Sequence, residues 1–245
     1  MIGEKKGTFA FLTQTCYTVI RLTGDEIVKK LVIFDLDGTL INSIEDLADS
    51  TNYALAQCGL PTHPVAPYNY FVGDGVDLLI RRAMPAEKRE DDALFQKIKD
   101  IYMPYYKEHS LDKTRPYPGI EALLEKCNQQ GVLIAVVSNK PHSITGGVVQ
   151  SFFPNITFAA AMGQREDIPK KPDPAGVLEV LRLTGIEKAD ALYVGDTSVD
   201  IRTGKNSGVA SCGVTWGFRP RSELEEHKAD YIAETVSSLE EIIFA

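Results

Sequence analysis

The sequence predicts an α/β fold: a parallel sheet covered by helices on both faces, with a small all-helical domain inserted after the first strand. Two observations carry this prediction. From residue 31 onward, short apolar runs that suit buried strands alternate with stretches of helical periodicity. By contrast, the long interval between the first two apolar runs shows helical periodicity alone.

Five segments have the pattern of buried strands. They cover residues 31–36, 132–138, 157–162, 191–196 and 209–215, and the third has the weakest pattern. Helical spacing of apolar residues is found at 119–130, 174–185, 199–207 and 236–243. Ligands of such sheets bind beyond the carboxyl ends of the strands, which is where Asp35, Ser138 and Asp196 are expected.

The interval 47–113 predicts the inserted domain. Its helical patterns cover 47–58, 76–83 and 91–108. Prolines and the pair Gly73 and Gly75 separate these patterns, and no strand is evident. The remaining residues, 31–46 and 114–245, are expected to form the α/β core.

Residues 1–30 form an N-terminal extension whose role the sequence leaves open. The segment 8–22 is rich in β-branched and aromatic residues, which suits a strand or hairpin, but an unstructured leader fits equally well. Its apolar stretch is too short for a signal peptide.

Composition narrows the classes of function. The formal net charge is -8, with a sequence pI of about 5.1, which argues against a sequence-independent nucleic-acid binder. The four cysteines are scattered without a CxxC pair, as in proteins with reduced thiols and no zinc site. No segment is long and apolar enough to suggest a membrane span. We therefore expect a cytoplasmic protein without a nucleic-acid or membrane partner.

Asp35 and Asp37 are the most informative residues in the chain. They follow the apolar run Leu-Val-Ile-Phe, and Gly38 lets the chain turn away behind them. Side chains alternate along an extended strand, so the two carboxylates can project to one side. Such a pair suits divalent-metal binding and phosphate chemistry, although an ordinary acidic loop after a strand is the simpler alternative.

A second acidic cluster follows the fourth expected strand. Asp196 ends that strand, and Asp200 comes one helical turn later, where the helix dipole alone would favour an acid. If Asp35, Asp37 and Asp196 converge, they need a cation among them, and an all-oxygen ligand set favours Mg²⁺.

Ser138 and Lys171 are candidate phosphate ligands. Ser138 ends the second expected strand, and its hydroxyl could bind a phosphoryl oxygen or cap the next helix. Lys171 precedes a proline and a new helix, where it could neutralise phosphate charge or be simply solvated.

These residues form four motifs along the chain. They are Asp-x-Asp-Gly-Thr at 35–39, Ser138, Lys171 followed by proline, and Gly-Asp-x-x-x-Asp at 195–200. In these motifs the chain resembles the haloacid dehalogenase superfamily of phosphohydrolases, over roughly residues 31–245. The resemblance implies a Rossmann-like core, and it implies that the helical insertion is a cap that closes over the site.

The resemblance also implies a mechanism. Asp35 would attack phosphorus and form an aspartyl-phosphate, while Asp37 would act as general acid and then as general base. Mg²⁺ would be held by Asp35, the Asp37 backbone carbonyl and Asp196. Asp200 would ligate through water or orient Lys171.

Phosphate binding follows from the same resemblance. Ser138, Asn139, Lys171 and backbone N–H groups around 36–38 would hold the phosphoryl oxygens.

Within the superfamily, the chain is most similar to phosphoglycolate phosphatases, in the stretches 71–79, 138–141 and 213–218. Asn42 departs from that pattern, because many relatives have aspartate there. The expected function is Mg²⁺-dependent hydrolysis of a small phosphorylated metabolite, with 2-phosphoglycolate as the first candidate. The alternatives are a β-phosphoglucomutase-like sugar phosphomutase and a non-catalytic ligand-binding protein, but retention of Asp35 and Asp37 argues against the latter.

Three residues of the insertion are candidate substrate contacts. Gly73 and Gly75 could form a tight turn that enters the site, or an ordinary turn between helices. Arg81 could bind a substrate carboxylate, although a solvated helix face is the common role of such a residue.

Overall fold

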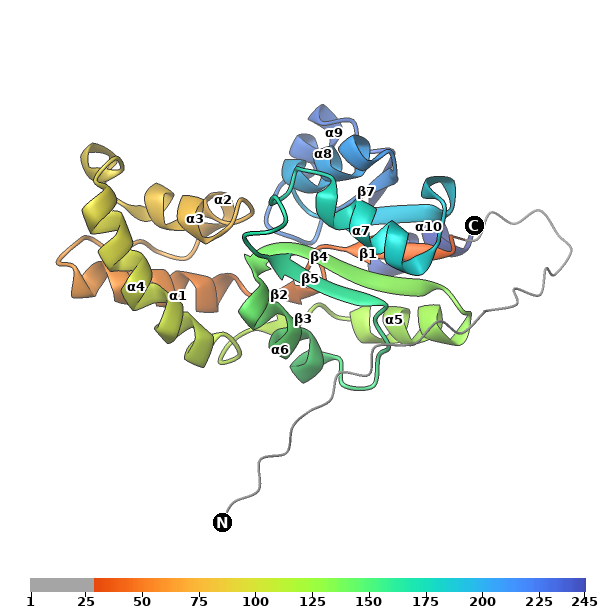
Figure 1. The fold of residues 1–245 in the computed structure, drawn as a ribbon, viewed down its shortest axis with the longest axis horizontal. Coiled ribbons are helices and arrows are strands. Elements are labelled where there is room, and N and C mark those ends of the chain that lie inside the picture. Colours follow the sequence, from red (N-terminus) through yellow and green to blue (C-terminus); the bar gives the residue numbers. More distant parts are fainter. Residues whose placement is uncertain (1–28) are drawn as a thin grey trace, which may run out of the picture.

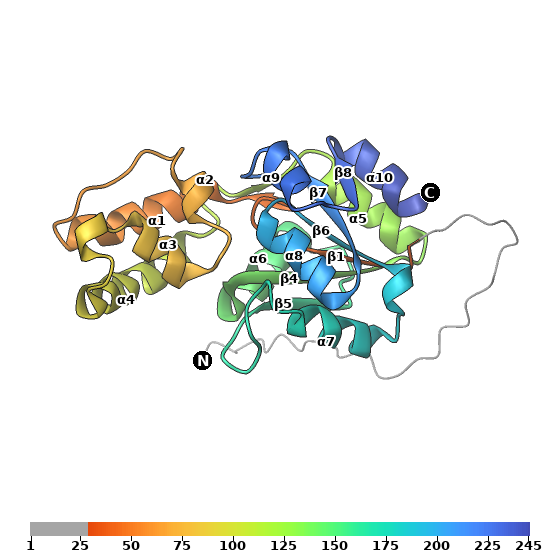
Figure 2. The same cartoon turned by 90° about the horizontal axis from the view of Figure 1, so that it is seen from above.

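The computed structural model describes residues 29–245, so the strand or hairpin considered for 8–22 lies outside the described residues. The described chain has two parts, a sheet surrounded by helices and a separate group of helices beside it (Figures 1 and 2). Within 29–245, no helix combines the length and apolarity that crossing a membrane requires.

The first part is a six-stranded parallel sheet with the strand order β5-β4-β1-β6-β7-β8. Its strands are β1 (Leu31–Phe34), β4 (Leu133–Pro141), β5 (Ala160–Gln164), β6 (Ala191–Gly195), β7 (Ala210–Val214) and β8 (Tyr231–Ala233). All four residues of β1 are buried, because the strand is central and has a parallel neighbour on each side. The predicted parallel α/β sheet is confirmed.

Helices cover both faces of this sheet, as predicted. On one face Val32 and Phe34 pack in a cluster with apolar residues of α5 (Ile120–Gln129), α6 (His142–Phe152) and α10 (Val236–Phe244). On the other face the alternate residues Leu31 and Ile33 pack with α7 (Ala175–Thr184). Figure 1 shows α5 and α6 below the sheet, with α7 and α8 (Ser198–Ser207) above it.

The structure adds elements that the sequence pattern did not indicate. The sheet has six strands rather than five, because the three-residue β8 pairs with β7. Helices α6 and α9 (Arg221–Glu226) were also missed. Strand β4 continues past Ser138 to Pro141, so Ser138 lies inside the strand rather than at its end.

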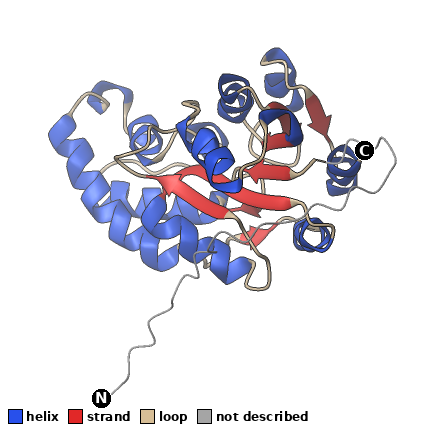
Figure 3. Cartoon of the chain, turned by 45° about the vertical axis from the view of Figure 1, so that its right-hand side comes forward, coloured by secondary structure: helices blue, strands red, loops and turns tan. Residues whose placement is uncertain are grey.

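The second part is a group of helices between β1 and β4. It contains α1 (Ile44–Gln57), α2 (Tyr68–Phe71), α3 (Val76–Ala83), a 3₁₀ turn (Ala86–Lys88) and α4 (Asp92–His109). Helix α1 packs against α4, and no strand occurs in the described chain between these helices (Figure 3). We call residues 44–109 the helical insertion.

Two short strands connect the helical insertion to the core. Antiparallel β2 (Ile41–Asn42) and β3 (Arg115–Pro116) lie side by side at its base. The buried Asp46 carboxylate accepts hydrogen bonds from the Lys113 and Thr114 backbone N–H groups and from the Thr114 hydroxyl. This fixes the start of α1 to the returning chain, so the helical insertion has a defined base beside the sheet edge.

Candidate active site

The carboxyl edge of the sheet brings the predicted residues together. Asp35 follows β1, Ser138 lies in β4, Asp196 follows β6 and Asp200 lies in the first turn of α8. Lys171 comes from the loop before α7. Five residues that span 166 positions of the sequence therefore meet at one edge, because parallel strands end there.

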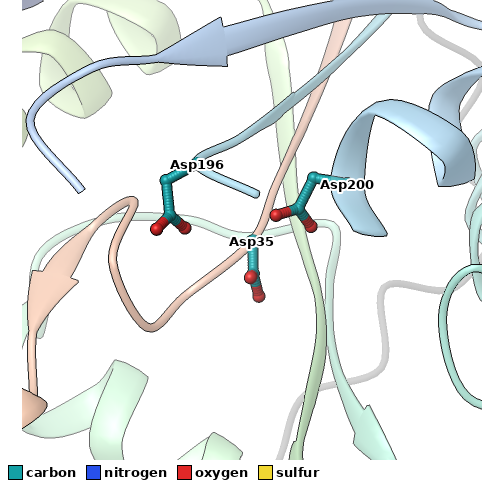
Figure 4. A group of neighbouring side chains, drawn as sticks. All are labelled: Asp35, Asp196 and Asp200. Atoms are coloured by element: carbon teal, nitrogen blue, oxygen red, sulfur yellow. The ribbon is translucent and has the colours of Figure 1, made fainter. Parts of the chain in front are cut away.

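Asp35, Asp196 and Asp200 form a buried carboxylate cluster. One oxygen from each lies within 4.8 Å of the others, and Figure 4 shows the three side chains as neighbours. The carboxylate of Asp37, a predicted metal ligand through its backbone carbonyl, is not in this cluster. Asp200, predicted to lie behind the ligands, is part of it.

Lys171 is the cation of this cluster. Its Nζ lies 2.9 Å from Asp35 Oδ1 and 2.7 Å from Asp200 Oδ1, and its side chain is buried. Burial alone would lower the pKa of Lys171, but Asp200 and Asp35 raise it well above its usual range. Lys171 therefore stays charged and can offer a fixed positive group to an anion beside Asp35.

Both carboxylate oxygens of Asp200 are engaged. Its Oδ1 accepts from Lys171, and its Oδ2 accepts from the Thr197 backbone N–H and hydroxyl. A capping box of this kind fixes a residue in the first helical turn. The contacts suit Asp200 to orienting Lys171.

Asp35 and Asp196 carry charge that the protein compensates only in part. Burial raises the pKa of Asp35 to about 6, although Lys171 opposes this rise. Burial, followed by the charges of Asp200 and Asp35, raises the pKa of Asp196 well above its usual range. Within residues 29–245, the donors to the Asp196 carboxylate are neutral: the Phe218 N–H at 2.8 Å and the Thr39 hydroxyl at 3.1 Å. An oxygen-only, electron-rich cluster of this kind fits a hard divalent cation.

Two glycines give the Asp196 carboxylate its space. A Cβ on Gly38, which has φ of +85°, would lie 2.4 Å from Asp196 Oδ2. A Cβ on Gly217 would lie 2.3 Å from Asp196 Cβ. The sequence indicated the turn at Gly38, but the close approach of Gly217 depends on the tertiary fold.

Asp37 makes its own ion pair outside the carboxylate cluster. Lys140 Nζ lies 2.9 Å from Asp37 Oδ1, and the Ser43 hydroxyl donates to the same oxygen at 2.6 Å. Lys140 also contacts the hydroxyl of Tyr106, which belongs to the helical insertion. Sequence reasoning missed Lys140, although it lies two residues beyond Ser138 on the same strand and hence on the same face.

A cleft lies between this edge and the helical insertion. The core contributes Asp35, Asp37, Ser138, Asn139, Lys140 and Pro141, and the insertion contributes Leu47, Val72, Gly73, Gly75, Val76, Leu79, Tyr102 and Tyr106. Arg81, a predicted substrate contact, does not line the cleft. It pairs with Asp92 at 2.5 Å within the insertion.

The segment Val72–Asp74 of the insertion is held by side chains from the core. Arg219 donates to the Val72 carbonyl at 2.9 Å, Asn139 to the Gly73 carbonyl at 3.1 Å and Lys170 to the Asp74 carbonyl at 3.2 Å. Three successive carbonyls are therefore bound from strand β4 and two core loops, and this fixes the edge of the cleft.

Asn139, a predicted phosphate ligand, uses its amide for backbone contacts. Its Oδ1 accepts from the Lys171 N–H at 2.8 Å, and its Nδ2 donates to the Lys171 and Gly73 carbonyls. These bonds connect the backbone of Lys171 to the segment of the insertion that covers the cleft.

Comparison with known proteins agrees with this fold and site. The profile of the family described as haloacid dehalogenase-like hydrolase matches residues 32–214. A protein of Mannheimia succiniciproducens named phosphoglycolate phosphatase is 33% identical over 219 residues, covering 87% of this chain and 98% of its own. One of that name from Mesorhizobium japonicum is 34% identical, covering 80% and 87% of the two chains.

A solved structure is similar as well. The crystal structure of a predicted phosphoglycolate phosphatase from Haemophilus somnus matches with a TM-score of 0.81 at 30% identity, covering 87% of this chain and 97% of that one.

The chain belongs to the haloacid dehalogenase-like hydrolases. Within that family it is a phosphoric monoester hydrolase similar to phosphoglycolate phosphatases.

Proposed function

We propose that this enzyme hydrolyses a small phosphomonoester through an aspartyl-phosphate on Asp35, with Mg²⁺ as cofactor and 2-phosphoglycolate as substrate. The observation that carries the proposal is the convergence of Asp35, Lys171 and Asp196 at one sheet edge, beside the cleft that the helical insertion covers. The relatives' names supply the choice of substrate.

The residues present fit a magnesium ion. Asp35 and Asp196 would hold it together with the Asp37 backbone carbonyl. Burial and the neighbouring carboxylates raise the pKa of both acids, so a divalent cation would stabilise their ionised forms. When bound, Mg²⁺ neutralises phosphate charge and aligns the displacement.

Asp35 and Asp37 divide the chemistry. A carboxylate oxygen of Asp35 attacks phosphorus, the bond between phosphorus and the leaving oxygen breaks, and Asp37 delivers a proton to that oxygen. Asp37 then takes a proton from water as the water oxygen attacks the phosphoryl group, which releases inorganic phosphate and restores Asp35. The Ser43 and Lys140 contacts hold Asp37 outside the carboxylate cluster, where a leaving group can reach it.

Lys171 and Ser138 stabilise the transferring group. Lys171 Nζ lies beside the attacking carboxylate, so its charge faces the phosphoryl oxygens as negative charge develops on them. Ser138 lines the same cleft and can donate its hydroxyl. We assign Asp200 the role of orienting Lys171, because its own acceptors are engaged.

The helical insertion, as a cap, would exclude water and select the leaving group. Two observations support this role. The residues on its side of the cleft are largely apolar, and core side chains donate hydrogen bonds to the carbonyls of Val72–Asp74. The free cysteines Cys58, Cys127 and Cys212 suit the cytoplasmic location that we also propose.

The test is a panel of phosphomonoesters assayed with the full chain, with Mg²⁺ and with EDTA. We expect the highest kcat/KM for 2-phosphoglycolate, and loss of turnover in EDTA that Mg²⁺ restores. Asp35→Asn should lower kcat by at least about 10³-fold while the protein stays folded, and Asp100→Asn on the exposed face of α4 is the matched control. Turnover by folded Asp35→Asn at the control's rate would reject the nucleophile.

A further inference from the structure

Lys140 is a buried cation to which the proposed chemistry assigns no contact with the substrate. It lies near the end of β4, its side chain is 2% exposed, and its Nζ is 2.9 Å from Asp37 Oδ1. Lys171 already supplies the positive charge beside Asp35. Lys140 is therefore a second charge, placed on the leaving-group side of the reaction, where Asp37 acts.

The positive charge of Lys140 is distinct among the residues that line the cleft. Among the described residues that line the cleft, Lys140 is the only cation. The walls nearby are mostly apolar, including Leu47, Val76 and Leu79 of the helical insertion. An electrostatic attraction is stronger beside such walls than in water, so an anionic group on the ligand would be drawn to Lys140.

Lys140 has binding capacity to spare. An ammonium group has three N–H donors, and the contacts to Asp37 and Tyr106 engage two partners. Tyr106 accepts from Lys140, which leaves its own hydroxyl proton to donate. Burial raises the pKa of Tyr106 well above its usual range, so this proton stays in place.

A third donor lines the same cleft. The Tyr102 hydroxyl is buried and has no hydrogen-bond partner among residues 29–245, and its ring stacks on Tyr106 with centroids 5.3 Å apart. A buried hydroxyl without a partner costs about 1–3 kcal/mol, so its retention here needs an explanation. A ligand that accepts a hydrogen bond would supply one.

The reach of Lys140 defines which ligand group it can meet. A general acid approaches the leaving oxygen to about 2.6–3.2 Å. Since Lys140 Nζ is 2.9 Å from the same carboxylate, an anionic group on the carbon next to the leaving oxygen can reach Nζ.

We propose that Lys140, with the hydroxyls of Tyr102 and Tyr106, forms a subsite for an anionic group adjacent to the leaving oxygen, and so makes the enzyme selective for phosphomonoesters of 2-hydroxy carboxylates. This inference rests on the proposed function. Lys140 comes from the core and both tyrosines come from the helical insertion, so the subsite is complete only when the two parts are together.

The experiment compares two substrates that differ in this one charge. They are 2-phosphoglycolate and 2-hydroxyethyl phosphate, in which a neutral hydroxymethyl group replaces the carboxylate. We measure kcat/KM for both with Mg²⁺, in the full chain and in the variants Lys140→Met, Lys140→Arg and Tyr102→Phe.

We expect the unmodified protein to prefer 2-phosphoglycolate by about 10²-fold, and Lys140→Met to lose about 10–100-fold of that preference. Both substrates should lose some rate, because Asp37 loses its partner, but the charged one should lose more. Lys140→Arg should keep most of the preference.

Tyr102→Phe is the variant that is safe for folding, because it removes a hydroxyl that has no partner. It should lower the preference about 3–10-fold without lowering the melting temperature, which a purely structural role would not do.

Three outcomes overturn the inference. If the unmodified protein hydrolyses both substrates equally well, the subsite does not exist, although the proposed function stands. If Lys140→Met reduces both substrates by the same factor, Lys140 only holds Asp37. If neither substrate turns over with Mg²⁺, the proposed function fails and the inference fails with it. Should Lys140→Met not fold, the intrinsic preference and Tyr102→Phe decide.

Discussion

Removal of Mg²⁺ should make the protein less stable as the pH rises, because Asp35 is buried beside other carboxylates. Burial raises its pKa from 3.8 to about 6. Between these values the folded protein holds a proton that the unfolded chain has released. Unfolding therefore releases a proton in this pH window, so the free energy of unfolding falls as the pH rises through it.

The magnitude follows from the pKa of Asp35. A change of one pH unit in a pKa corresponds to about 1.4 kcal/mol, so the rise from 3.8 to about 6 corresponds to about 3 kcal/mol. Asp35→Asn removes the titrating group and keeps its shape. In EDTA at pH 5, where the unfolded carboxyl is already ionised and the folded one is mostly not, this variant should be the more stable by about 1.5 kcal/mol. At pH 8, Asp35→Asn should be the more stable by about 3 kcal/mol.

Urea unfolding in EDTA at both pH values measures this difference, and the comparison cancels the carboxylates that the two proteins share. Addition of Mg²⁺ at pH 8 should stabilise the unmodified protein more than Asp35→Asn, because the ion supplies the missing charge. The reasoning is refuted if Asp35→Asn in EDTA is equally stable or less stable at pH 8.

The fold makes two further predictions. Gly217→Ala would place a Cβ 2.3 Å from Asp196 Cβ, so we expect an Mg²⁺ affinity at least about tenfold weaker, measured by calorimetry. The control is Gly147→Ala in α6, where a Cβ would have no atom within 4 Å, and it should bind Mg²⁺ normally. Equal affinities would contradict this packing argument. Arg219→Met removes the bond to the Val72 carbonyl, so KM should rise about 3–10-fold with the fold intact, and an unchanged KM would show that this contact does not secure the cleft.

Much of the fold was predictable because the local patterns are strong. The continuous apolar run of β1 suits only a doubly covered strand, and the acids at its end mark the edge that carries the site. Asp35, Ser138 and Asp196 could be expected together because parallel strands align their carboxyl ends, and the family resemblance added Lys171. Helix α3 was predicted with its observed bounds, Val76–Ala83, because its apolar residues recur at helical spacing.

The rest depends on contacts between distant segments. Strand β8 has three residues, too few for a pattern, and exists because β7 offers an edge. The pairing of Asp37 with Lys140 joins residues 103 positions apart, and Tyr106 reaches Lys140 only because the helical insertion folds back on the sheet. Such partners follow from topology, and a linear pattern does not reveal them.

The proposed function requires that Asp35 becomes covalently phosphorylated during turnover. The most direct measurement is rapid acid quenching of the Mg²⁺-loaded enzyme with ³²P-labelled 2-phosphoglycolate, followed by mapping of the labelled peptide. We expect a transient acid-stable label on Asp35. Full hydrolysis without a protein-bound label, or a label on a different residue, would contradict it.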